Sequence, residues 1–327
     1  MSTRAVAEAR TNIALVKYWG KRDATLNLPA VGSISLTLDG LATRTEVVWD
    51  PAQPRDRFFL HHIEQSGRPL ERVLKLIERV RSRGGRSASS TVRSQNNFPT
   101  ASGLASSASA FAALALAAVR SCPLDLSQDE LCALARCGSG SAARSLYGGF
   151  VEMHRGDRID GSDAVARPLA EWDLRLVIGL AGEAEKSTLS TEGMSHTAET
   201  SPYYPAWIER HAADLAAART AILRQDLEAL GVVAERSCLR MHASALAADP
   251  GILYWNGATV EAFHAIRRLR QRGVGVWFTN DAGPHIKGLC APNDAAAVAT
   301  AIGQIPGIVR TIVCSPGAGA TLLELET

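Results

Sequence analysis

The most unusual stretch of this sequence is a loop of small residues, 99–108, which reads PTASGLASSA and leads into an alanine-rich segment. Gly103 allows the backbone a positive φ, and the small side chains leave room for a ligand. Ser106 and Ser107 stand where a helix should begin, and unpaired N–H groups and the helix dipole favour an anion there. The loop therefore predicts a phosphate site whose serine hydroxyls add donors or coordinate Mg²⁺. A serine N-cap in front of a tightly packed helix explains the same residues equally well.

A second turn of small residues, 138–144, reads GSGSAAR. Its glycines and serines again let the backbone approach an anion. Arg144 can form a bidentate pair with a carboxylate. A single arginine more often binds helix-end carbonyls or a neighbouring Glu, so both interpretations stay open.

One carboxylate occupies a position that suits proton handling. Asp281 follows an apolar run, 274–278, and stands in a turn that Gly283 and Pro284 make rigid. A carboxylate on a rigid loop at the end of a strand is well placed for acid–base work. By itself, such an aspartate is more often a turn former that bonds its own backbone.

Two lysines and a tyrosine come together after an apolar run near the start of the chain. Lys17 lies inside that run, where an unpaired charge is costly, so it requires an anionic partner. Lys21 and Tyr18 could reach a phosphate. The alternative is an ordinary strand end whose lysines extend their ammonium groups to water.

The apolar pattern places these residues on a mixture of strands and helices, without the strict alternation of a doubly wound sheet. We expect a hairpin whose strands, 33–39 and 43–49, flank a turn at Asp39-Gly40. Further strands are expected at 91–95, 148–154, 174–180, 274–279 and, as the last one, 308–314. Helices are expected at 70–80, 106–119, 129–136, 214–230 and 260–269, with one more capped by Asn293. The sequence thus predicts an α+β fold, with a boundary near residues 171–172.

Composition narrows the choice of partners. The net charge of the 327 residues is +2, and no basic stripe interleaved with aromatic residues suggests nucleic acid. The longest apolar segment, 110–119, is about half of what a membrane-spanning helix needs. No charged leader precedes an apolar stretch, and the six cysteines have neither metal-ligand nor redox spacing. We therefore expect a cytoplasmic protein whose partners are small molecules.

Six ordered segments, from about residue 10 to residue 285, together resemble one family. They read NIALVKYWGKRD, LNLPAVGSISLTLDG, SQNNFPTASGLASSASAFAAL, GSGSAARSLYGGF, STEGMSHTAETSP and FTNDAGPH. The third alone indicates only the GHMP kinase superfamily, whereas the first and the last resemble its diphosphomevalonate decarboxylase branch. The resemblance implies a two-lobed GHMP kinase-like fold with the active site in the cleft. It places an ATP-binding lobe at 1–172 and a second lobe at 173–327, in a homodimer.

The resemblance also implies roles for individual residues. Asp281 matches the catalytic aspartate that faces the substrate 3-hydroxyl, and Lys17 matches a lysine between that aspartate and ATP. Arg144 matches the residue that engages the substrate carboxylate. The nucleotide contacts are expected at Asn96, Pro99, Ser102, Gly103, Leu104, Ala105, Ser106 and Ser107, with Ser107 also catalytic and a Mg²⁺ ligand. The substrate contacts are expected at Tyr18, Lys21, Ser139, Ser141, Arg144 and Ser190, the last in a mobile loop.

The implied reaction is ATP-dependent decarboxylation of mevalonate 5-diphosphate to isopentenyl diphosphate, CO₂, ADP and phosphate. Asp281 and Lys17 argue against a pure mevalonate 3-kinase, and the intact serine loop argues against a non-catalytic ligand sensor. A phosphomevalonate decarboxylase would need the same pair. Thr191 follows Ser190 where some bacterial relatives have Arg, and the missing basic residue weakens the case for two phosphates on the substrate. His285 stands where many relatives have Asn.

Overall fold

The structure, a computed structural model, describes residues 3–98, 104–182 and 188–324. Its larger sheet has the order β14-β1-β4-β7-β5-β6, and β8 joins β4 to β9. These strands are β1 (Arg4–Val16), β4 (Ser33–Asp50), β5 (Arg57–Leu60), β6 (Ile63–Glu64), β7 (Ser89–Asn96), β8 (Phe150–Met153), β9 (Ala166–Ala170) and β14 (Thr321–Leu323). A short hairpin, β2 (Lys21–Asp23) with β3 (Leu28–Pro29), lies beside it.

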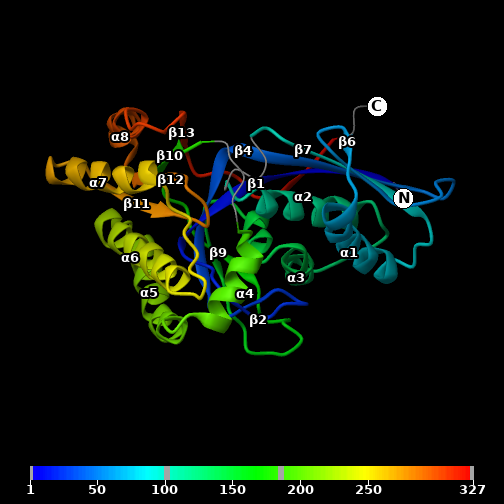
Figure 1. Ribbon diagram of the computed structural model, residues 1–327. Helices are drawn as coiled ribbons and strands as arrows, with labels where there is room; N and C mark the ends of the chain where they lie inside the picture. The colour runs from blue at the N-terminus through cyan, green and yellow to red at the C-terminus, as the bar shows by residue number, and fades with distance from the viewer. Residues whose placement is uncertain (1–2, 99–103, 183–187, 325–327) are drawn as a thin grey trace.

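Three helices cover one face of this sheet (Figure 1). They are α1 (Gly67–Arg83), α2 (Ser106–Arg120) and α3 (Gln128–Gly138). Alanines and leucines are buried along nearly all of α2, because it lies between the sheet and the other two helices. α1 ends at Arg83, directly before Gly84 and Gly85.

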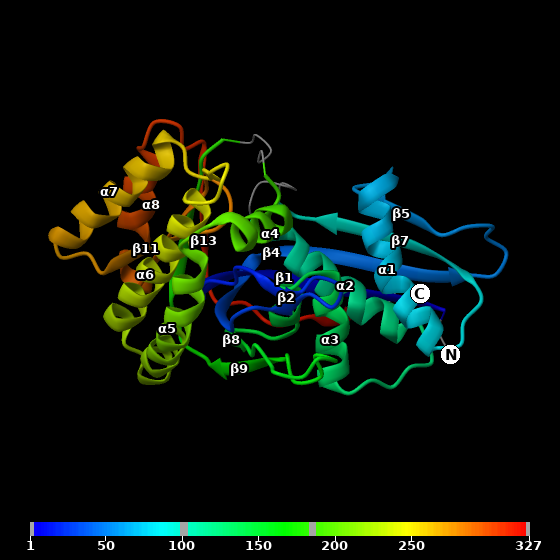
Figure 2. The same cartoon turned by 60° about the horizontal axis from the view of Figure 1, so that its bottom comes forward.

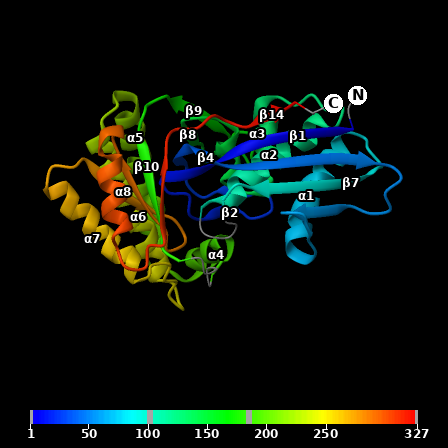
Figure 3. The same cartoon turned by 90° about the horizontal axis from the view of Figure 1, so that it is seen from above.

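A second, four-stranded antiparallel sheet has the order β11-β12-β10-β13 and lies across one end of the first sheet (Figures 1 and 3). Its strands are β10 (Arg175–Leu180), β11 (Val276–Asn280), β12 (Ile286–Cys290) and β13 (Arg310–Cys314). Side chains of α5 (Tyr204–Arg224) and α6 (Leu227–Leu246) pack on one face, and those of α7 (Gly257–Gln271) and α8 (Ala295–Gly303) on the other. The shorter α4 (Ser190–Thr200) lies between the two assemblies (Figure 2).

This arrangement confirms the α+β prediction. The division of the chain at residue 172 stays a prediction, although the four-stranded sheet draws its strands from 175–314 and β14 returns to pair with β1. Among the described residues, no helix has both the length and the apolarity to cross a bilayer.

The predicted hairpin at Asp39-Gly40 is wrong. β4 is one strand of 18 residues that pairs with β1 along both of its halves. The register shifts between Arg10 and Asn12, so Asp39 and Gly40, the latter at φ +83°, form a bulge. Tertiary contact stabilises it, since the Asp39 amide donates to the Ser315 carbonyl at 2.8 Å.

Three smaller predictions also fail. The helix expected at 214–230 spans the end of α5 and the start of α6, because Gln225 adopts a left-handed conformation (φ 54°) between them. Apolar periodicity continues through the break, so the pattern alone did not show it. Asn293 lies in a short 3-10 turn at 292–294 instead of capping α8. Strand 308–314 is not the last one, because β14 follows it.

We predict that Asp226→Ala lowers the free energy of unfolding by about 1 kcal/mol. The Asp226 side chain accepts a hydrogen bond from the Ala229 amide at 2.9 Å and so caps α6 where the two helices separate. Urea unfolding followed by circular dichroism measures the change. Asp226→Asn, which keeps the cap, is the control, and equal losses in both variants would contradict the capping role.

Candidate active site

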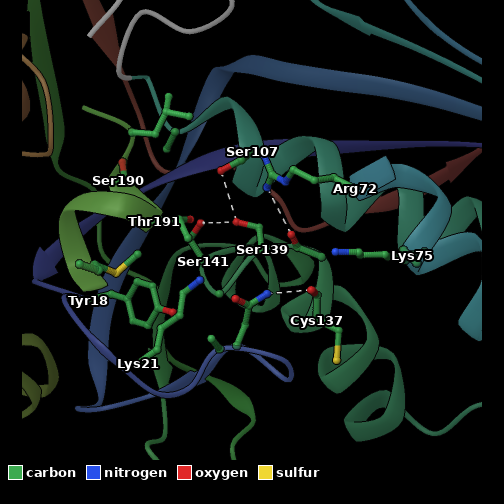
Figure 4. A pocket seen from close by; sticks show the side chains of 18 of the residues that line it. Tyr18, Lys21, Arg72, Lys75, Ser107, Cys137, Ser139, Ser141, Ser190 and Thr191 are labelled. Carbon is green, nitrogen blue, oxygen red and sulfur yellow. Dashed lines mark hydrogen bonds between the residues drawn. The ribbon is translucent and has the colours of Figure 1, made fainter. Parts of the chain in front are cut away.

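A cavity of about 1690 Å³ lies between the two sheet assemblies. Its walls come from the end of β1, the exposed face of α1, the start of α2, the turn at 138–144 and the start of α4 (Figure 4). Asp281 lines the same cavity. The segments that carried the sequence prediction therefore converge on one space, although they are far apart in the chain.

The buried Lys17 meets its anionic partner at Asp281. The side chain of Lys17 is 1% exposed, and its Nζ lies 2.7 Å from Asp281 Oδ1 and 2.8 Å from the Ala14 carbonyl oxygen. A second ammonium, that of Lys287, lies 3.1 Å from Asp281 Oδ2 and is also 1% exposed. Asp281 itself keeps 25% of its side chain exposed, on the cavity side. The turn-former interpretation thus gives way to a carboxylate held by two lysines.

Sequence reasoning missed Lys287, although the signal was present. Lys287 stands in an apolar run that reads IKGLC, six residues after Asp281. Like Lys17, a lysine in an apolar strand needs an anionic partner.

The charges of the two lysines decide the ionisation of Asp281. Burial alone would raise the pKa of this carboxyl group, but Lys17 and Lys287 outweigh it and hold that pKa well below its usual range. Burial lowers the pKa of Lys287, while the charge of Asp281 opposes that change. Asp281 is therefore an ionised carboxylate of low basicity at neutral pH.

Helix α6 supports this charged group from behind. The Lys17 amide donates to Ser237 Oγ at 3.0 Å, which fixes the end of β1 against the helix. The Asn280 amide donates to Cys238 Sγ at 3.2 Å, one residue before the catalytic candidate. Burial lowers the pKa of His242 to about 3, so the neighbouring imidazole is neutral at physiological pH. The α6 side chains next to Asp281 are thus neutral, and hydrogen bonds fix the helix to the strands that lead to Lys17 and Asp281.

Arg144 lies on the floor of the cavity, 2% exposed. Its Nε donates to Ser35 Oγ at 2.9 Å and to Asn12 Oδ1 at 3.2 Å, and its Nη1 donates to Ser33 Oγ. All three partners are neutral side chains. Arg144 therefore binds neither helix-end carbonyls nor a neighbouring Glu, which were the alternatives from the sequence. Burial lowers the pKa of Arg144 to about 10, which leaves it cationic at neutral pH. The arrangement provides a fixed positive charge for an anionic group in the cavity.

A chain of serine hydroxyls joins the two loops that the sequence singled out. Ser107 Oγ lies 3.3 Å from Ser139 Oγ, and Ser139 Oγ lies 3.2 Å from Ser141 Oγ (Figure 4). Ser106 and Ser107 form the first turn of α2, directly after Ala105 in a left-handed conformation (φ 56°). The N-cap is thus Ala105, without a side-chain cap bond, and the serine hydroxyls remain on the cavity wall.

The remaining nucleotide candidates lie around this helix start. Asn96, at the end of β7, accepts a hydrogen bond from Thr43 Oγ1 at 2.7 Å. Leu104 is buried, 1% exposed, in the apolar cluster beneath. Pro99, Ser102 and Gly103 lie outside the described residues. A smaller cavity of about 160 Å³ begins at Ser106 and Ser107 and extends between β4, β7 and α1.

Basic side chains gather at the opposite end of the main cavity. Tyr18 and Lys21 lie there as predicted, together with Arg72 and Lys75 of α1, which sequence reasoning missed (Figure 4). The Tyr18 hydroxyl is buried without a hydrogen-bond partner among the described residues, and burial raises its pKa far above the usual value. Burial and the nearby charge of Arg72 lower the pKa of Lys21. The sequence signal for Arg72 and Lys75 was their spacing, because two basic residues three apart lie on the same face of a helix.

Helix α4 closes one side of the cavity. Ser190 is its first residue, and Ser190 and Thr191 both line the cavity (Figure 4). Glu192 pairs with Arg68 of α1 at 2.6 Å, which connects the two walls. Gly193 lets α4 approach Tyr254 closely, since a methyl group there would lie 2.4 Å from the tyrosine hydroxyl. The mobile loop expected at Ser190 is therefore a helix start in this structure.

The fold and the site together define a protein of the GHMP kinase-like class, with a serine-lined helix N-terminus facing a cleft. Residues 9–166 match the family model of the diphosphomevalonate decarboxylase-like N-terminal domain. Residues 176–310 match that of the mevalonate 5-diphosphate decarboxylase C-terminal domain.

The chain is also similar along most of its length to known diphosphomevalonate decarboxylases. The human diphosphomevalonate decarboxylase is 39% identical over 305 residues, which cover 85% of this chain and 74% of the human protein. The Staphylococcus aureus mevalonate diphosphate decarboxylase structure covers 99% of both chains at 37% identity, with a TM-score of 0.94. A structure described as MDDEF in complex with MVAPP, AMPPCP and magnesium is 37% identical, with a TM-score of 0.93 over 99% of both chains. This chain belongs to the diphosphomevalonate decarboxylase family, which confirms the family prediction.

We predict that Gly140→Ala raises the KM for the phosphorylated substrate roughly tenfold, the equivalent of one lost hydrogen bond. A Cβ at residue 140 would lie 2.3 Å from the Tyr18 hydroxyl and would displace this ring from the cavity wall. Steady-state kinetics measure KM. Gly257→Ala, where an added methyl group meets nothing within 4 Å, is the matched control. Equal KM values in the two variants would argue against a role for Tyr18 in binding.

Proposed function

We propose that this protein decarboxylates mevalonate 5-diphosphate with ATP and releases isopentenyl diphosphate, CO₂, ADP and phosphate. The observation that carries the proposal is the ionised Asp281, held between Lys17 and Lys287, in the cavity that the serines of α2 also line. A tertiary hydroxyl is a poor leaving group and must be phosphorylated before the carboxylate can leave. The site supplies a group for the hydroxyl, a place for ATP phosphates and a cation for the substrate carboxylate.

ATP would place its phosphates at the start of α2. Unpaired amides and the dipole at this end favour an anion, and the hydroxyls of Ser106 and Ser107 add donors. The base would enter the smaller cavity, whose apolar lining includes Phe58 and Phe111 and whose polar groups include Asn96. This route leads the terminal phosphate into the main cavity toward Asp281.

The residues near α2 also fit Mg²⁺. Hard oxygen donors suit this ion, and Ser107 offers a hydroxyl beside the expected phosphates. Within the described residues, no three acidic, histidine or cysteine side chains gather to form a metal site, so phosphate oxygens would supply most ligands. When bound, the ion neutralises charge on the transferring phosphate.

Asp281 would orient the 3-hydroxyl and accept its hydrogen bond in line with the terminal phosphate of ATP. Because two lysines suppress the basicity of this carboxylate, full proton removal before phosphoryl transfer is disfavoured. Lys17, whose Nζ contacts Asp281, would interact with the incoming phosphate. This assignment follows phosphoryl transfer in general, in which positioning and charge stabilisation supply most of the catalysis.

Arg144 would position the substrate carboxylate. When the 3-phosphate leaves, positive charge develops on the 3-carbon, and collapse of the carboxylate to CO₂ neutralises it. A cation that held the carboxylate more strongly before this step than during it would slow the reaction. The serines and Asn12 restrain the guanidinium from one side, which favours positioning over tight charge neutralisation.

The basic end of the cavity favours a 5-diphosphate over a monophosphate. Lys21, Arg72 and Lys75 line it, and none of the three has an ion-pair partner among the described residues. The hydroxyls of Tyr18, Ser139 and Ser141 add neutral donors. Thr191 supplies no charge where some relatives have Arg, but Arg72 and Lys75 compensate from α1.

We expect an ADP-release assay to rank mevalonate 5-diphosphate above the 5-phosphate, and the 5-phosphate above mevalonate, in kcat/KM. Three cations facing the phosphate end favour the more highly charged substrate. CO₂ release should match ADP release one to one. A higher kcat/KM for the 5-phosphate would reassign the protein to the phosphomevalonate decarboxylases, and ADP release without CO₂ would identify a 3-kinase.

We expect Asp281→Asn to retain ATP binding but to lose kcat by roughly 10²- to 10⁴-fold. The amide cannot accept hydrogen bonds from the hydroxyl and from both lysines as an ionised carboxylate does. Calorimetric titration with ATP checks binding and folding, and CO₂ release checks turnover. Near-normal turnover would remove Asp281 from the reaction.

The expected cytoplasmic location and homodimer remain proposals. All six cysteines are free thiols, five of them buried, which is consistent with a reducing compartment. The dimer rests on the family resemblance.

A further inference from the structure

Lys287 occupies a place in the smaller sheet that an apolar residue would normally fill. It lies on β12, opposite Ile178 of β10 and Thr279 of β11. Its neighbours Ile286 and Cys290 pack into the core formed with α7 and α8, whereas Lys287 and Leu289 point to the opposite face. There, only 1% of the Lys287 side chain is exposed, and Nζ reaches Asp281 Oδ2 at 3.1 Å.

Stability does not explain this lysine. Removing an ammonium group from water is costly, and well-packed apolar residues often stabilise a protein more than a buried ion pair does. The charge of Asp281 is already compensated by Lys17, whose Nζ is 2.7 Å from Oδ1. With Lys287 added, two positive charges surround one negative charge, so the group has a surplus that folding does not require.

The contacts of the carboxylate show what the second lysine adds. Lys17 binds one oxygen and Lys287 the other, so rotation about the bond to the carboxyl carbon would break both contacts. Oδ2 is itself buried, and the 25% of the side chain that stays exposed faces the cavity. With Lys17 alone, the carboxylate could turn about the Oδ1 contact.

We propose that Lys287 is a positioning residue, which fixes the second oxygen of Asp281 so that the ionised carboxylate faces the substrate hydroxyl. This inference rests on the proposed function, because it assigns Asp281 to that hydroxyl. Lys287 does not contact substrate in this role; it acts through Asp281 on the phosphoryl-transfer step. Its loss should therefore lower kcat and leave the binding of both substrates largely unchanged.

Other charged groups that face Asp281 do not titrate in the working range. Arg144 approaches from the 3-10 turn at 142–146, and Cys238 and His242 approach from α6. Burial raises the pKa of Cys238 to about 11 and lowers that of His242 to about 3, so both are neutral near pH 7. A change in the ionisation of Asp281 on removal of Lys287 can thus be assigned to that lysine.

The first test is Lys287→Met, which keeps the length of the side chain and removes its charge. We expect the melting temperature to be unchanged or higher, KM values within about twofold and kcat lower by roughly 100-fold, the effect of a misplaced catalytic group. Arg270→Met is the matched control, because it removes a comparable cation that pairs with Glu235 at 2.7 Å away from the cavity. This control should lose stability and keep kcat.

A second variant keeps the test decisive if the methionine disturbs packing. Lys287→Ala leaves space for a small amine beside Asp281, so added ethylammonium should restore part of kcat, whereas it should not act on Lys287→Met. A kcat near that of the wild type in Lys287→Met would overturn the proposal. The proposal would also be overturned if both variants lost kcat together with their fold and if the amine restored no activity.

A measurement without substrate separates this proposal from the proposed function. In carbon-13 NMR of aspartate-labelled, ligand-free protein, the Asp281 signal, identified by its loss in Asp281→Asn, should titrate about 1 to 3 pH units higher in Lys287→Met than in the wild type. An unchanged titration would refute the role of Lys287 even if the enzyme is active. A shifted titration in a protein that releases no CO₂ would refute the proposed function and leave the effect of Lys287 on Asp281 established.

Discussion

Two buried ammonium groups meet one carboxylate where the two sheets come together, and the geometry around them has little freedom. Lys17 enters from the end of β1, Lys287 from the middle of β12, and Asp281 from the turn between β11 and β12. Separating Lys17 from Asp281 would leave a buried charge without its nearest partner, which costs several kcal/mol. The contact between the larger sheet and the smaller one is therefore specified by charge as well as by apolar packing.

Apolar surroundings give these charges their strength. Trp19, Met194, Tyr254 and Ala282 belong to one buried cluster beside the carboxylate, and α4 packs over it through Gly193. Because water is largely excluded there, electrostatic interactions are stronger than at a surface. The cavity opens on the other side, so the same group that is held by protein charges remains accessible to a ligand.

The fold brings three kinds of anion site into one cavity. The start of α2 offers amides and hydroxyls, Arg144 offers a restrained guanidinium, and α1 with Lys21 offers several cations. The chain of hydroxyls through Ser139 connects the first of these to the last. Phosphate, carboxylate and diphosphate differ in charge and shape, and we propose that each binds at one of the three. The GHMP kinase-like fold supplies the frame, and these side chains decide the chemistry.

The sequence alone determined the class of fold, the family and the polar residues that the two small-residue turns, Lys17 and Asp281 contribute to the cavity. Local signals sufficed for them: small residues before an alanine-rich helix, a lysine in an apolar strand, and an aspartate in a rigid turn. The bulge at residues 39–40 was misjudged because it depends on a contact with a distant segment, Ser315 against Asp39. The helix break at 225–226 depends on the left-handed conformation of Gln225 and on the Asp226 cap. The pattern of apolar residues continues through both places.

Only the tertiary structure decided which charges meet. Lys17 and Asp281 are separated by 264 residues, and no local pattern pairs them. Arg72 and Lys75 look like ordinary surface residues of an amphipathic helix until α1 is placed against the cavity. The sequence shows Lys287 as a buried charge that needs a partner, but its contact with the second oxygen of Asp281 depends on how β11, β12 and the turn between them are placed in three dimensions.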